Sequence, residues 1–215
     1  MDPYLLLGTK RNLIQLLRNK GITDENVLSA ILKVDRHLFV ESYLWSRAYE
    51  DAPLPIYCGQ TISQPSTVAF QTQLLRVSKG DKILEIGTGS GYQAAVLSAM
   101  GAKVFSVERH VDLFVKTKEL LSQIDPKIIL RCGDGFAGLP AFAPFNKIIV
   151  TCGAPEVPAA LLKQLSPEGV LVIPVGIEKQ VMKRFTKNPD GTICEENFGD
   201  FVFVPMLENI SKRKQ

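Results

Sequence analysis

Three glycines in the stretch LEIGTGSGYQAA have the spacing of a nucleotide-binding turn. Gly87, Gly89 and Gly91 follow an apolar run and precede a stretch with helical spacing. Glycine permits a tight turn and lets backbone amides approach a ligand closely. Glycine turns also serve simple strand-to-helix connections, so these three residues indicate a binding site only together with a partner elsewhere in the chain.

Glu108 is the first such partner. It ends the apolar run KVFSVE, about 20 residues beyond the central glycine, where a carboxylate can accept hydrogen bonds from both ribose hydroxyls of a nucleoside. Each such bond contributes roughly 1.5 to 3 kcal/mol. The alternative is a solvated glutamate at a strand end. Asp134 and Gly135, after the next apolar run, could meet an adenine amino group or form an ordinary Asp-Gly turn.

Tyr92 argues against a dinucleotide ligand. In dinucleotide folds of the hydride-transfer type, the last position of G-x-G-x-x-G is small, so that a pyrophosphate can lie on the helix N-terminus. That position is Tyr92 here. The turn better suits a nucleoside without a pyrophosphate, such as S-adenosylmethionine. An NAD-dependent oxidoreductase is disfavoured for this reason, and because no acid or base for hydride transfer is evident.

The stretch GQTISQP, residues 59–65, places small polar side chains upstream of the glycine turn. Ser63 could hold a reacting group there. Alternatively, Ser63 or Ser66 could cap a helix over about 66–76, with Pro65 in its first turn. The residues by themselves leave both interpretations open.

The elements that would position these residues form an α/β pattern. From Lys82 onward, compact apolar runs alternate with amphipathic stretches, as in βαβ units around a mostly parallel sheet. The expected strands cover 82–87, 103–108, 127–132, 147–151 and 169–175, and the expected crossover helices cover 92–100, 111–124 and 155–165. A hairpin at the sheet edge should pair 180–187 with 200–205.

The first third of the chain has helical spacing. One helix should end at Gly21 as its C-cap, and a second should begin after Thr23 as its N-cap. We expect one compact domain, in which residues 1–78 form a helical region that covers substrate and cofactor. Residues 79–215 then form the core with its edge hairpin.

The composition argues against several classes of protein. The net charge is +3 without a dense basic stripe, so a nucleic-acid partner is not expected. Four scattered cysteines and two histidines indicate no metal site. No leader and no apolar run long enough for a bilayer is evident. We expect a monomeric cytoplasmic protein with reduced thiols and no membrane partner, and interpret the basic tail Lys212, Arg213 and Lys214 as a solvated end.

Together these motifs resemble the protein-L-isoaspartate O-methyltransferase family. The resemblance covers about residues 10–206. It rests on RHLFV (36–40), AYEDAPLPI (48–56), GQTISQP (59–65), LEIGTGSGYQAAVL (84–97), VFSVER (104–109), GDG (133–135), PFNKIIVT (144–151) and LVIPVG (171–176). Methyltransferases in general share the glycine turn, whereas the TISQP stretch makes the combination specific.

The resemblance implies a Rossmann-like S-adenosylmethionine-dependent methyltransferase sheet with an antiparallel edge hairpin and an N-terminal helical extension. It also implies methyl transfer to the α-carboxylate of L-isoaspartyl residues in damaged proteins and peptides, with S-adenosylhomocysteine as product. The ester then closes to a succinimide, which opens partly to normal aspartate.

The resemblance further implies roles for individual residues. Ser63 would be catalytic, and Ser63 and Val204 would contact the substrate. Leu207 departs from the family pattern, which often has a small polar residue there. The implied cofactor contacts are Gln60, Thr61, Ile62, Ser63, Glu85, Gly87, Gly89, Gly91, Glu108, Arg109, Asp134 and Gly135.

The implied chemistry needs no general base, because a carboxylate with a pKa of about 4 is already ionised at pH 7. Alignment of the two reactants and exclusion of water remain, and alignment can lower the barrier by roughly 7 to 11 kcal/mol. We expect Ser63 to donate a hydrogen bond to one carboxylate oxygen and to aim the other at the methyl group. His37 should be a packing residue, and Cys152 should have no chemistry. Two alternatives stay open: methyl transfer to another acceptor, such as a small carboxylate, and an adaptor that binds without turnover.

Overall fold

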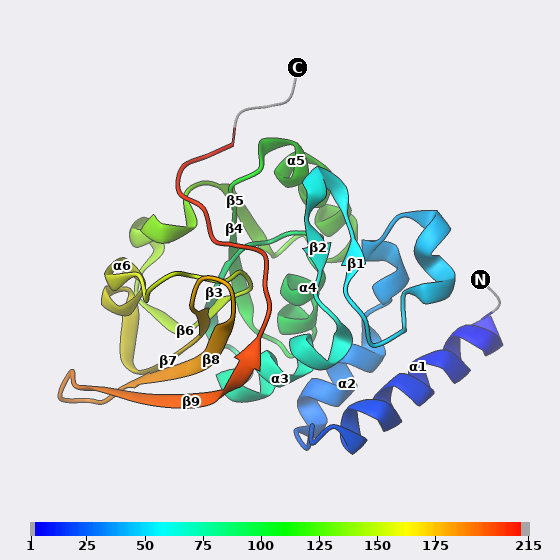
Figure 1. Ribbon diagram of the computed structural model, residues 1–215, viewed down its shortest axis with the longest axis horizontal. Coiled ribbons are helices and arrows are strands. Elements are labelled where there is room, and N and C mark those ends of the chain that lie inside the picture. Colours follow the sequence, from blue (N-terminus) through cyan, green and yellow to red (C-terminus); the bar gives the residue numbers. More distant parts are fainter. Residues whose placement is uncertain (1–2, 212–215) are drawn as a thin grey trace.

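The computed structural model describes residues 3–211 and centres on a seven-stranded sheet with the order β5-β4-β3-β6-β7-β8-β9 (Figure 1). Neighbouring strands from β5 to β7 are parallel, and β8 and β9 are antiparallel additions at one edge. The strands are β3 (Lys82–Ile86), β4 (Lys103–Glu108), β5 (Ile129–Cys132), β6 (Phe145–Val150), β7 (Leu165–Val175), β8 (Gln180–Lys187) and β9 (Ile193–Phe201). The predicted fold class is confirmed.

The sheet reverses its direction of growth at β3. From β3 the chain adds β4 and β5 on one side, then returns to place β6 and β7 on the other. In open α/β sheets, ligands bind outside the carboxyl ends of the strands at such a reversal. The central strands are continuous apolar runs because both faces of the sheet are covered.

Helices cover the two faces unequally. On one face lie α3 (Pro65–Leu75) and α4 (Tyr92–Ala99), together with the N-terminal helices α1 (Pro3–Asn19) and α2 (Glu25–Lys33). The other face is covered by the short α6 (Ala159–Lys163) and the 3₁₀ turn Pro140–Phe142. Leu17, Ile31, Ile83 and Val96 belong to one buried cluster, so the N-terminal helices share a core with the sheet.

The N-terminal region continues as 3₁₀ turns and a small ribbon. The turns are Arg36–Phe39, Ser42–Arg47 and Tyr57–Gly59, and the ribbon pairs β1 (Leu54–Pro55) with β2 (Thr61–Ile62). We call residues 54–63 the strap, because they lead the chain across the glycine turn into α3. Ile56 of the strap lies 3.7 Å from the position that a Cβ at Gly89 would take.

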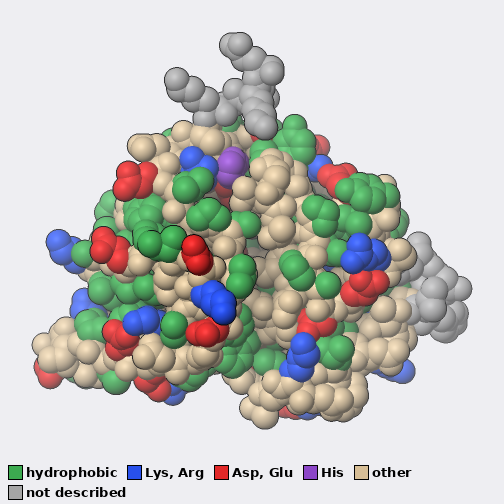
Figure 2. All heavy atoms as spheres, in the orientation of Figure 1, with side chains coloured by type: hydrophobic (Ala, Val, Ile, Leu, Met, Phe, Trp, Pro, Cys, Tyr) green, Lys and Arg blue, Asp and Glu red, His purple; other side chains and the backbone are tan. Residues whose placement is uncertain are grey.

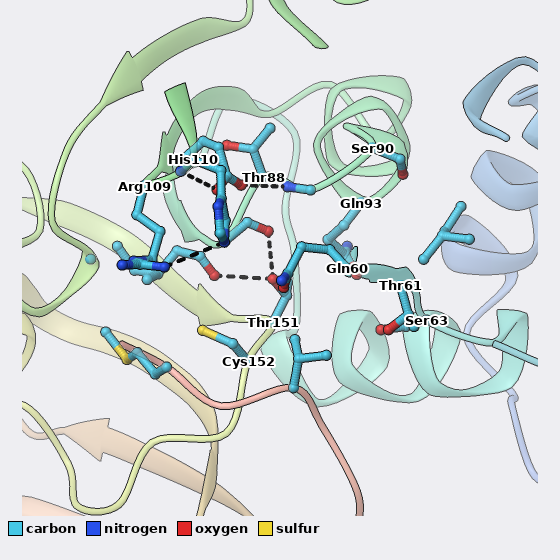
Figure 3. A pocket seen from close by; sticks show the side chains of 18 of the residues that line it. Gln60, Thr61, Ser63, Thr88, Ser90, Gln93, Arg109, His110, Thr151 and Cys152 are labelled. Carbon is cyan, nitrogen blue, oxygen red and sulfur yellow. Dashed lines mark hydrogen bonds between the residues drawn. The ribbon is translucent and has the colours of Figure 1, made fainter. Parts of the chain in front are cut away.

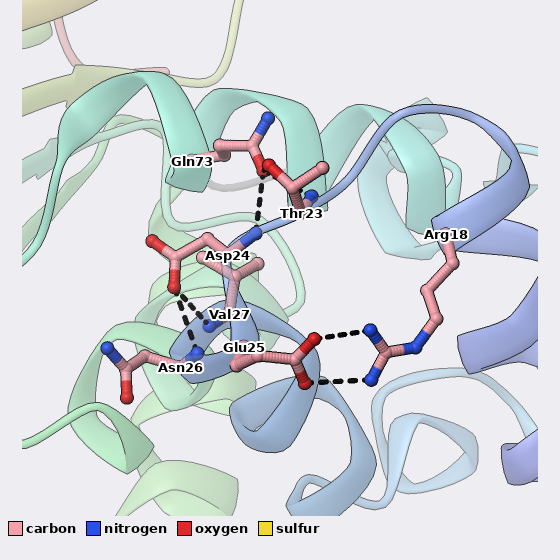
Figure 4. Close-up of polar contacts among 7 residues, drawn as sticks. All are labelled: Arg18, Thr23, Asp24, Glu25, Asn26, Val27 and Gln73. Carbon is pink, nitrogen blue, oxygen red and sulfur yellow. Dashed lines mark hydrogen bonds and ion pairs between the residues drawn. The ribbon is translucent and has the colours of Figure 1, made fainter.

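The junction between α1 and α2 differs from the expectation by one residue. Gly21 has φ +86 and follows α1 as predicted. The N-cap of α2 is Asp24 and not Thr23: the Asp24 carboxylate accepts the amides of Asn26 and Val27 at 2.9 and 3.3 Å (Figure 4). The Thr23 amide is used elsewhere, since it donates to Gln73 Oε1 of α3 at 2.8 Å.

Among the crossover helices, α5 (Val111–Ile124) has the expected range and α4 ends one residue before its expected end. The helix expected over 155–165 forms, but it is much shorter than predicted. Only Ala159–Lys163 is helical, and β7 already begins at Leu165. Pro155 and Pro158 are the physical reason. Proline has no N–H to donate within a helix, so the helix begins only after Pro158.

The edge hairpin forms with a different second strand. β8 pairs with Ile193–Phe201, so the expected pairing with 200–205 is confirmed only at Asp200 and Phe201 and is wrong for 202–205. The charges of Glu195 and Glu196 obscured β9 in the sequence, although charged residues are common on edge strands. The apolar residues after β9 instead cross the carboxyl ends of the strands (Figure 1), where the Gly153 amide donates to the Val204 carbonyl at 2.8 Å.

No helix within residues 3–211 combines the length and the apolar character needed to cross a membrane. The basic tail Lys212, Arg213 and Lys214 lies outside the described residues.

Candidate functional site

A pocket of about 220 Å³ opens at the carboxyl ends of the parallel strands, where the sheet reverses direction. Its wall combines the end of the strap, the glycine turn, the ends of β4 and β6 and the segment 204–207 (Figure 3). Most of the predicted site residues line it. They are Gln60, Thr61, Ile62, Ser63, Gly87, Gly89, Glu108, Arg109, Gly135 and Val204. Glu85, Gly91 and Asp134 do not.

The positions of the turn require glycine for different physical reasons. All three have positive φ, which glycine adopts without strain. A Cβ at Gly87 would lie 2.6 Å from Thr151 Oγ1, so Thr151, directly after β6, leaves no room for a side chain there. A Cβ at Gly91 would lie 2.9 Å from Thr117 of α5. Gly91 therefore allows close helix packing and does not reach the pocket, unlike the expectation from the motif.

Glu108 lies where the sequence predicts and is held by backbone amides. Its carboxylate accepts the Gly89 amide at 2.9 Å on one oxygen and the His110 amide at 2.8 Å on the other. Only 4% of the residue is exposed. A carboxylate has about four lone-pair sites, so the orientation is fixed while acceptor capacity toward the pocket remains.

Glu85 points away from the pocket, contrary to the expected cofactor contact. Side chains alternate along a strand, and Glu85 shares its face of β3 with Ile83, beneath the helices. It is fully buried, and Ser106 Oγ donates to it at 2.5 Å. Burial raises the pKa of Glu85 to about 8; the Ser106 hydrogen bond opposes this shift, and the charge of Glu108 adds to it. Ser106 Oγ lies 2.6 Å from Thr88 Oγ1, which reaches the pocket wall.

Asp134 forms an ordinary Asp-Gly turn, which was the alternative to a contact with an adenine amino group. Its carboxylate accepts the Phe136 amide at 2.9 Å and the Asn209 amide at 2.8 Å. The Arg109 side chain donates to the Asn209 carbonyl at 3.0 Å. Asp134 and Arg109 thus hold the C-terminal segment against the sheet, and only Gly135 of the Asp-Gly pair reaches the pocket.

Neither Ser63 nor Ser66 caps α3. The N-cap is Gln64, and the Ser66 amide donates to Asp51 Oδ1 at 2.8 Å. The Ser63 hydroxyl makes no hydrogen bond to another described residue, whereas the Ser63 carbonyl accepts Arg36 Nη2 at 2.8 Å. The hydroxyl of Ser63 is therefore available at the pocket wall (Figure 3).

Several polar residues of the wall were missed from the sequence. Gln93 is 6% exposed; its Nε2 donates to Thr72 Oγ1 at 2.9 Å, and its buried Oε1 has no partner among the described residues. Thr151 donates to the Gly87 carbonyl at 2.6 Å. Thr151 could have been found as a polar residue ending the strand beside β3. Gln71, in the middle of α3, offered no such signal.

His37 and Cys152 are placed as the sequence predicts. His37 is buried away from the pocket, with its Nδ1 2.8 Å from the Tyr49 hydroxyl and its ring against Trp45. Cys152 lines the pocket, but burial raises the pKa of its thiol to about 12. A protonated thiol is a poor nucleophile. Within residues 3–211, no group of His, Cys, Asp or Glu side chains is arranged to hold a metal ion.

Comparison with known proteins agrees with the geometry. A model of the protein-L-isoaspartate(D-aspartate) O-methyltransferase family matches residues 8–211. A Flavobacterium psychrophilum relative named protein-L-isoaspartate O-methyltransferase is 54% identical over 207 residues, which cover 94% of this chain and 95% of the relative. A Christiangramia forsetii relative with the same name is 51% identical over 210 residues, covering 97% and 98%.

Solved structures show the same similarity. One named protein-L-isoaspartate O-methyltransferase has a TM-score of 0.86 at 31% identity, covering 94% of this chain and 67% of that one. A Plasmodium falciparum structure of that type, in complex with S-adenosyl-L-homocysteine, has a TM-score of 0.81 at 26% identity, covering 92% and 98%. Because the family match extends over nearly the whole chain, this chain belongs to the protein-L-isoaspartate(D-aspartate) O-methyltransferase family.

Proposed function

We propose that this chain transfers the methyl group of S-adenosylmethionine to the α-carboxylate of L-isoaspartyl residues in damaged proteins and peptides. The resulting ester closes to a succinimide, which opens partly to aspartate and so repairs the backbone. The observation that carries the proposal is a single pocket that contains the Ser63 hydroxyl together with the glycine turn and Glu108.

The pocket residues fit S-adenosylmethionine. Glu108 has acceptor capacity for ribose hydroxyls. Gln60, Thr61, Ile62, Arg109 and Gly135 complete this side of the wall. The cofactor supplies an electrophilic methyl group on a positively charged sulfur.

The protein's part in the reaction is alignment. The substrate carboxylate is ionised at neutral pH, so the protonated Cys152 and the distant His37 are not required as bases. Ser63 Oγ donates a hydrogen bond to one carboxylate oxygen, which directs the other oxygen toward the methyl group. The strap and segment 204–207 limit the access of water, which would otherwise solvate the carboxylate.

Peptide contacts are proposed for Val204 and Ser63. The Val204 carbonyl is engaged by the Gly153 amide, whereas its own N–H has no partner within residues 3–211. That N–H can donate to a peptide carbonyl. Leu207 lines the pocket with about half of its surface exposed, so apolar contact replaces the polar contact that the family pattern suggests at this position.

We also propose that the protein acts as a cytoplasmic monomer on proteins and not on nucleic acid. One chain supplies every segment of the pocket wall. None of its four cysteines, which all lie within residues 3–211, forms a disulfide, as in a reducing compartment. Acidic and basic side chains are mixed across the visible face (Figure 2). Light scattering with and without S-adenosylhomocysteine tests the monomer, and a concentration-dependent dimer mass would contradict it.

The function is tested with two synthetic peptides that differ only in an isoaspartyl or a normal aspartyl linkage. Each is incubated with the protein and methyl-labelled S-adenosylmethionine. We expect label on the isoaspartyl peptide alone, released slowly as methanol. Label on both peptides would indicate a different acceptor specificity. Label on neither, with the cofactor still bound, would favour the adaptor alternative.

A further inference from the structure

Arg36 is a fully buried arginine joined to the segment that carries Ser63. None of its surface is exposed, and it does not line the pocket. Its Nε donates to the Ala48 carbonyl and its Nη2 to the Ser63 carbonyl, both at 2.8 Å. The guanidinium carbon lies 4.7 Å from the centre of the Tyr92 ring. One planar group therefore contacts three separate parts of the chain.

Two of these parts, at Ser63 and at Tyr92, belong to the pocket wall, and the third, at Ala48, does not. Ser63 ends the strap, and Tyr92 is the first residue of α4, directly after the glycine turn. Ala48 follows the 3₁₀ turn Ser42–Arg47. Because the guanidinium is a rigid fork of donors, it fixes Ser63 relative to the glycine turn. The spacing between the proposed substrate and cofactor positions thus depends on Arg36.

The burial of Arg36 is also electrically uncompensated. A buried charge carries a large desolvation penalty unless it is paired, yet no carboxylate within residues 3–211 forms an ion pair with Arg36. Its Nη1 makes no hydrogen bond of ordinary geometry within these residues, and the Tyr92 side chain is the neutral group that interacts with the guanidinium. Asp51 acts on it only at longer range and is itself bonded by Lys20 at 2.6 Å.

Arg184 is a second buried arginine of the molecule, and its charge is paired with a carboxylate. It is 7% exposed and lies over the Phe198 ring at 4.9 Å, much as Arg36 lies over Tyr92. Arg184, however, donates to both carboxylate oxygens of Glu196, at 2.8 and 2.7 Å. Arg184 thus has a carboxylate partner, whereas Arg36 lacks one within the described chain.

We infer that Arg36 is a positioning residue for methyl transfer: it holds Ser63 at a fixed separation from the glycine turn, and its unpaired positive charge favours a substrate carboxylate at Ser63. This inference rests on the proposed function for the identity of the substrate. The geometric part, the anchoring of Ser63, stands on the hydrogen bonds alone.

Three variants separate the two effects from simple loss of stability. Arg36→Met removes both charge and fork, Arg36→Lys keeps the charge but loses the fork, and Arg184→Met removes a matched buried arginine that does not line the pocket. Rates are measured on an isoaspartyl peptide and divided by the concentration of S-adenosylhomocysteine-binding sites. Unfolded protein then does not contribute, and Arg36→Lys keeps the test valid if Arg36→Met does not fold.

The expected pattern is a split between kcat and KM. Arg36→Met should lower kcat by about 100-fold and raise the peptide KM by about tenfold. Arg36→Lys should keep KM within about threefold because the charge remains, while kcat falls by about tenfold. Arg184→Met should match the wild type in both constants. The inference is overturned if Arg36→Met loses stability as Arg184→Met does but keeps wild-type kcat and KM.

Hydrogen exchange tests the anchoring without relying on activity. With S-adenosylhomocysteine bound, the amides of residues 60–64 and 66 should exchange faster in Arg36→Met and Arg36→Lys than in the wild type, and no faster in Arg184→Met. Equal exchange in all four proteins would refute the anchoring. If the wild type does not methylate isoaspartyl peptides, the proposed function fails, and the exchange rates still decide whether Arg36 positions Ser63.

Discussion

The Ser63 hydroxyl has no hydrogen-bond partner among the described residues. It is not needed as a helix cap, the role that the sequence context suggested for it. Asp51, more than ten residues upstream, accepts the Ser66 amide at the start of α3. The first turn of a helix needs such an acceptor, and with Asp51 in place neither serine is required for it. From the sequence alone this could not be decided, since Asp51 reaches α3 only through the fold of the N-terminal region.

Ser63→Ala should lower kcat/KM on an isoaspartyl peptide by roughly 10- to 100-fold, because the carboxylate loses the donor that orients it. The affinity for S-adenosylhomocysteine should change far less, since the glycine turn and Glu108 remain. Steady-state kinetics and calorimetry measure the two quantities. Ser66→Ala is the control and should retain turnover. Full turnover in Ser63→Ala with loss in Ser66→Ala would contradict the assignment.

Glu85 predicts a pH dependence of stability. Its pKa is about 8 in the folded protein and about 4.3 when unfolded. Between these values the folded state binds more protons than the unfolded state, so the free energy of unfolding falls as pH rises. Glu85→Gln cannot ionise and should lose less stability than the wild type from pH 5 to pH 9, by roughly 2 to 4 kcal/mol.

Urea unfolding at pH 5 and pH 9 measures this difference. Glu178→Gln, at an exposed position in the loop before β8, is the matched control and should follow the wild-type pH curve. Parallel curves for Glu85→Gln and the wild type would show that Glu85 is ionised in the folded state at both pH values.

At the scale of elements, the sequence predicted what depends on local periodicity. The range of α5 and the five parallel strands follow from apolar runs and helical spacing, and the structure confirms them. The errors arose where one residue type overrode the pattern. Pro158 delayed α6, and the charges of Glu195 and Glu196 obscured β9.

The cap of α2 shows the same limit and gives a test. Thr23 and Asp24 are both good capping residues, and only the structure shows that Asp24 accepts the two amides. Asp24→Ala should therefore lower the free energy of unfolding by about 0.5 to 2 kcal/mol. Thr23→Ala should cost less, because Thr23 uses mainly its backbone amide. Denaturant unfolding compares them, and a larger loss for Thr23→Ala would contradict the cap assignment.

At the scale of the whole molecule, the pocket combines segments that are far apart in sequence. The strap, the glycine turn, the ends of β4 and β6 and the segment after β9 meet at the reversal point of the sheet. Motifs predicted most of these segments one by one. Gln71, Gln93 and the link from Arg36 to Ser63 could not be predicted, because they depend on how α3, α4 and the N-terminal region pack on one another.

The central claim is that one pocket presents the substrate carboxylate to the cofactor through Ser63. A crystal structure of the protein with S-adenosylhomocysteine and an isoaspartyl peptide tests it most directly. The account predicts a carboxylate oxygen about 2.6 to 3.2 Å from Ser63 Oγ, the ribose hydroxyls on Glu108, and the second carboxylate oxygen facing the sulfur. An isoaspartyl carboxylate bound away from Ser63, or a nucleoside that does not contact Glu108, would contradict it.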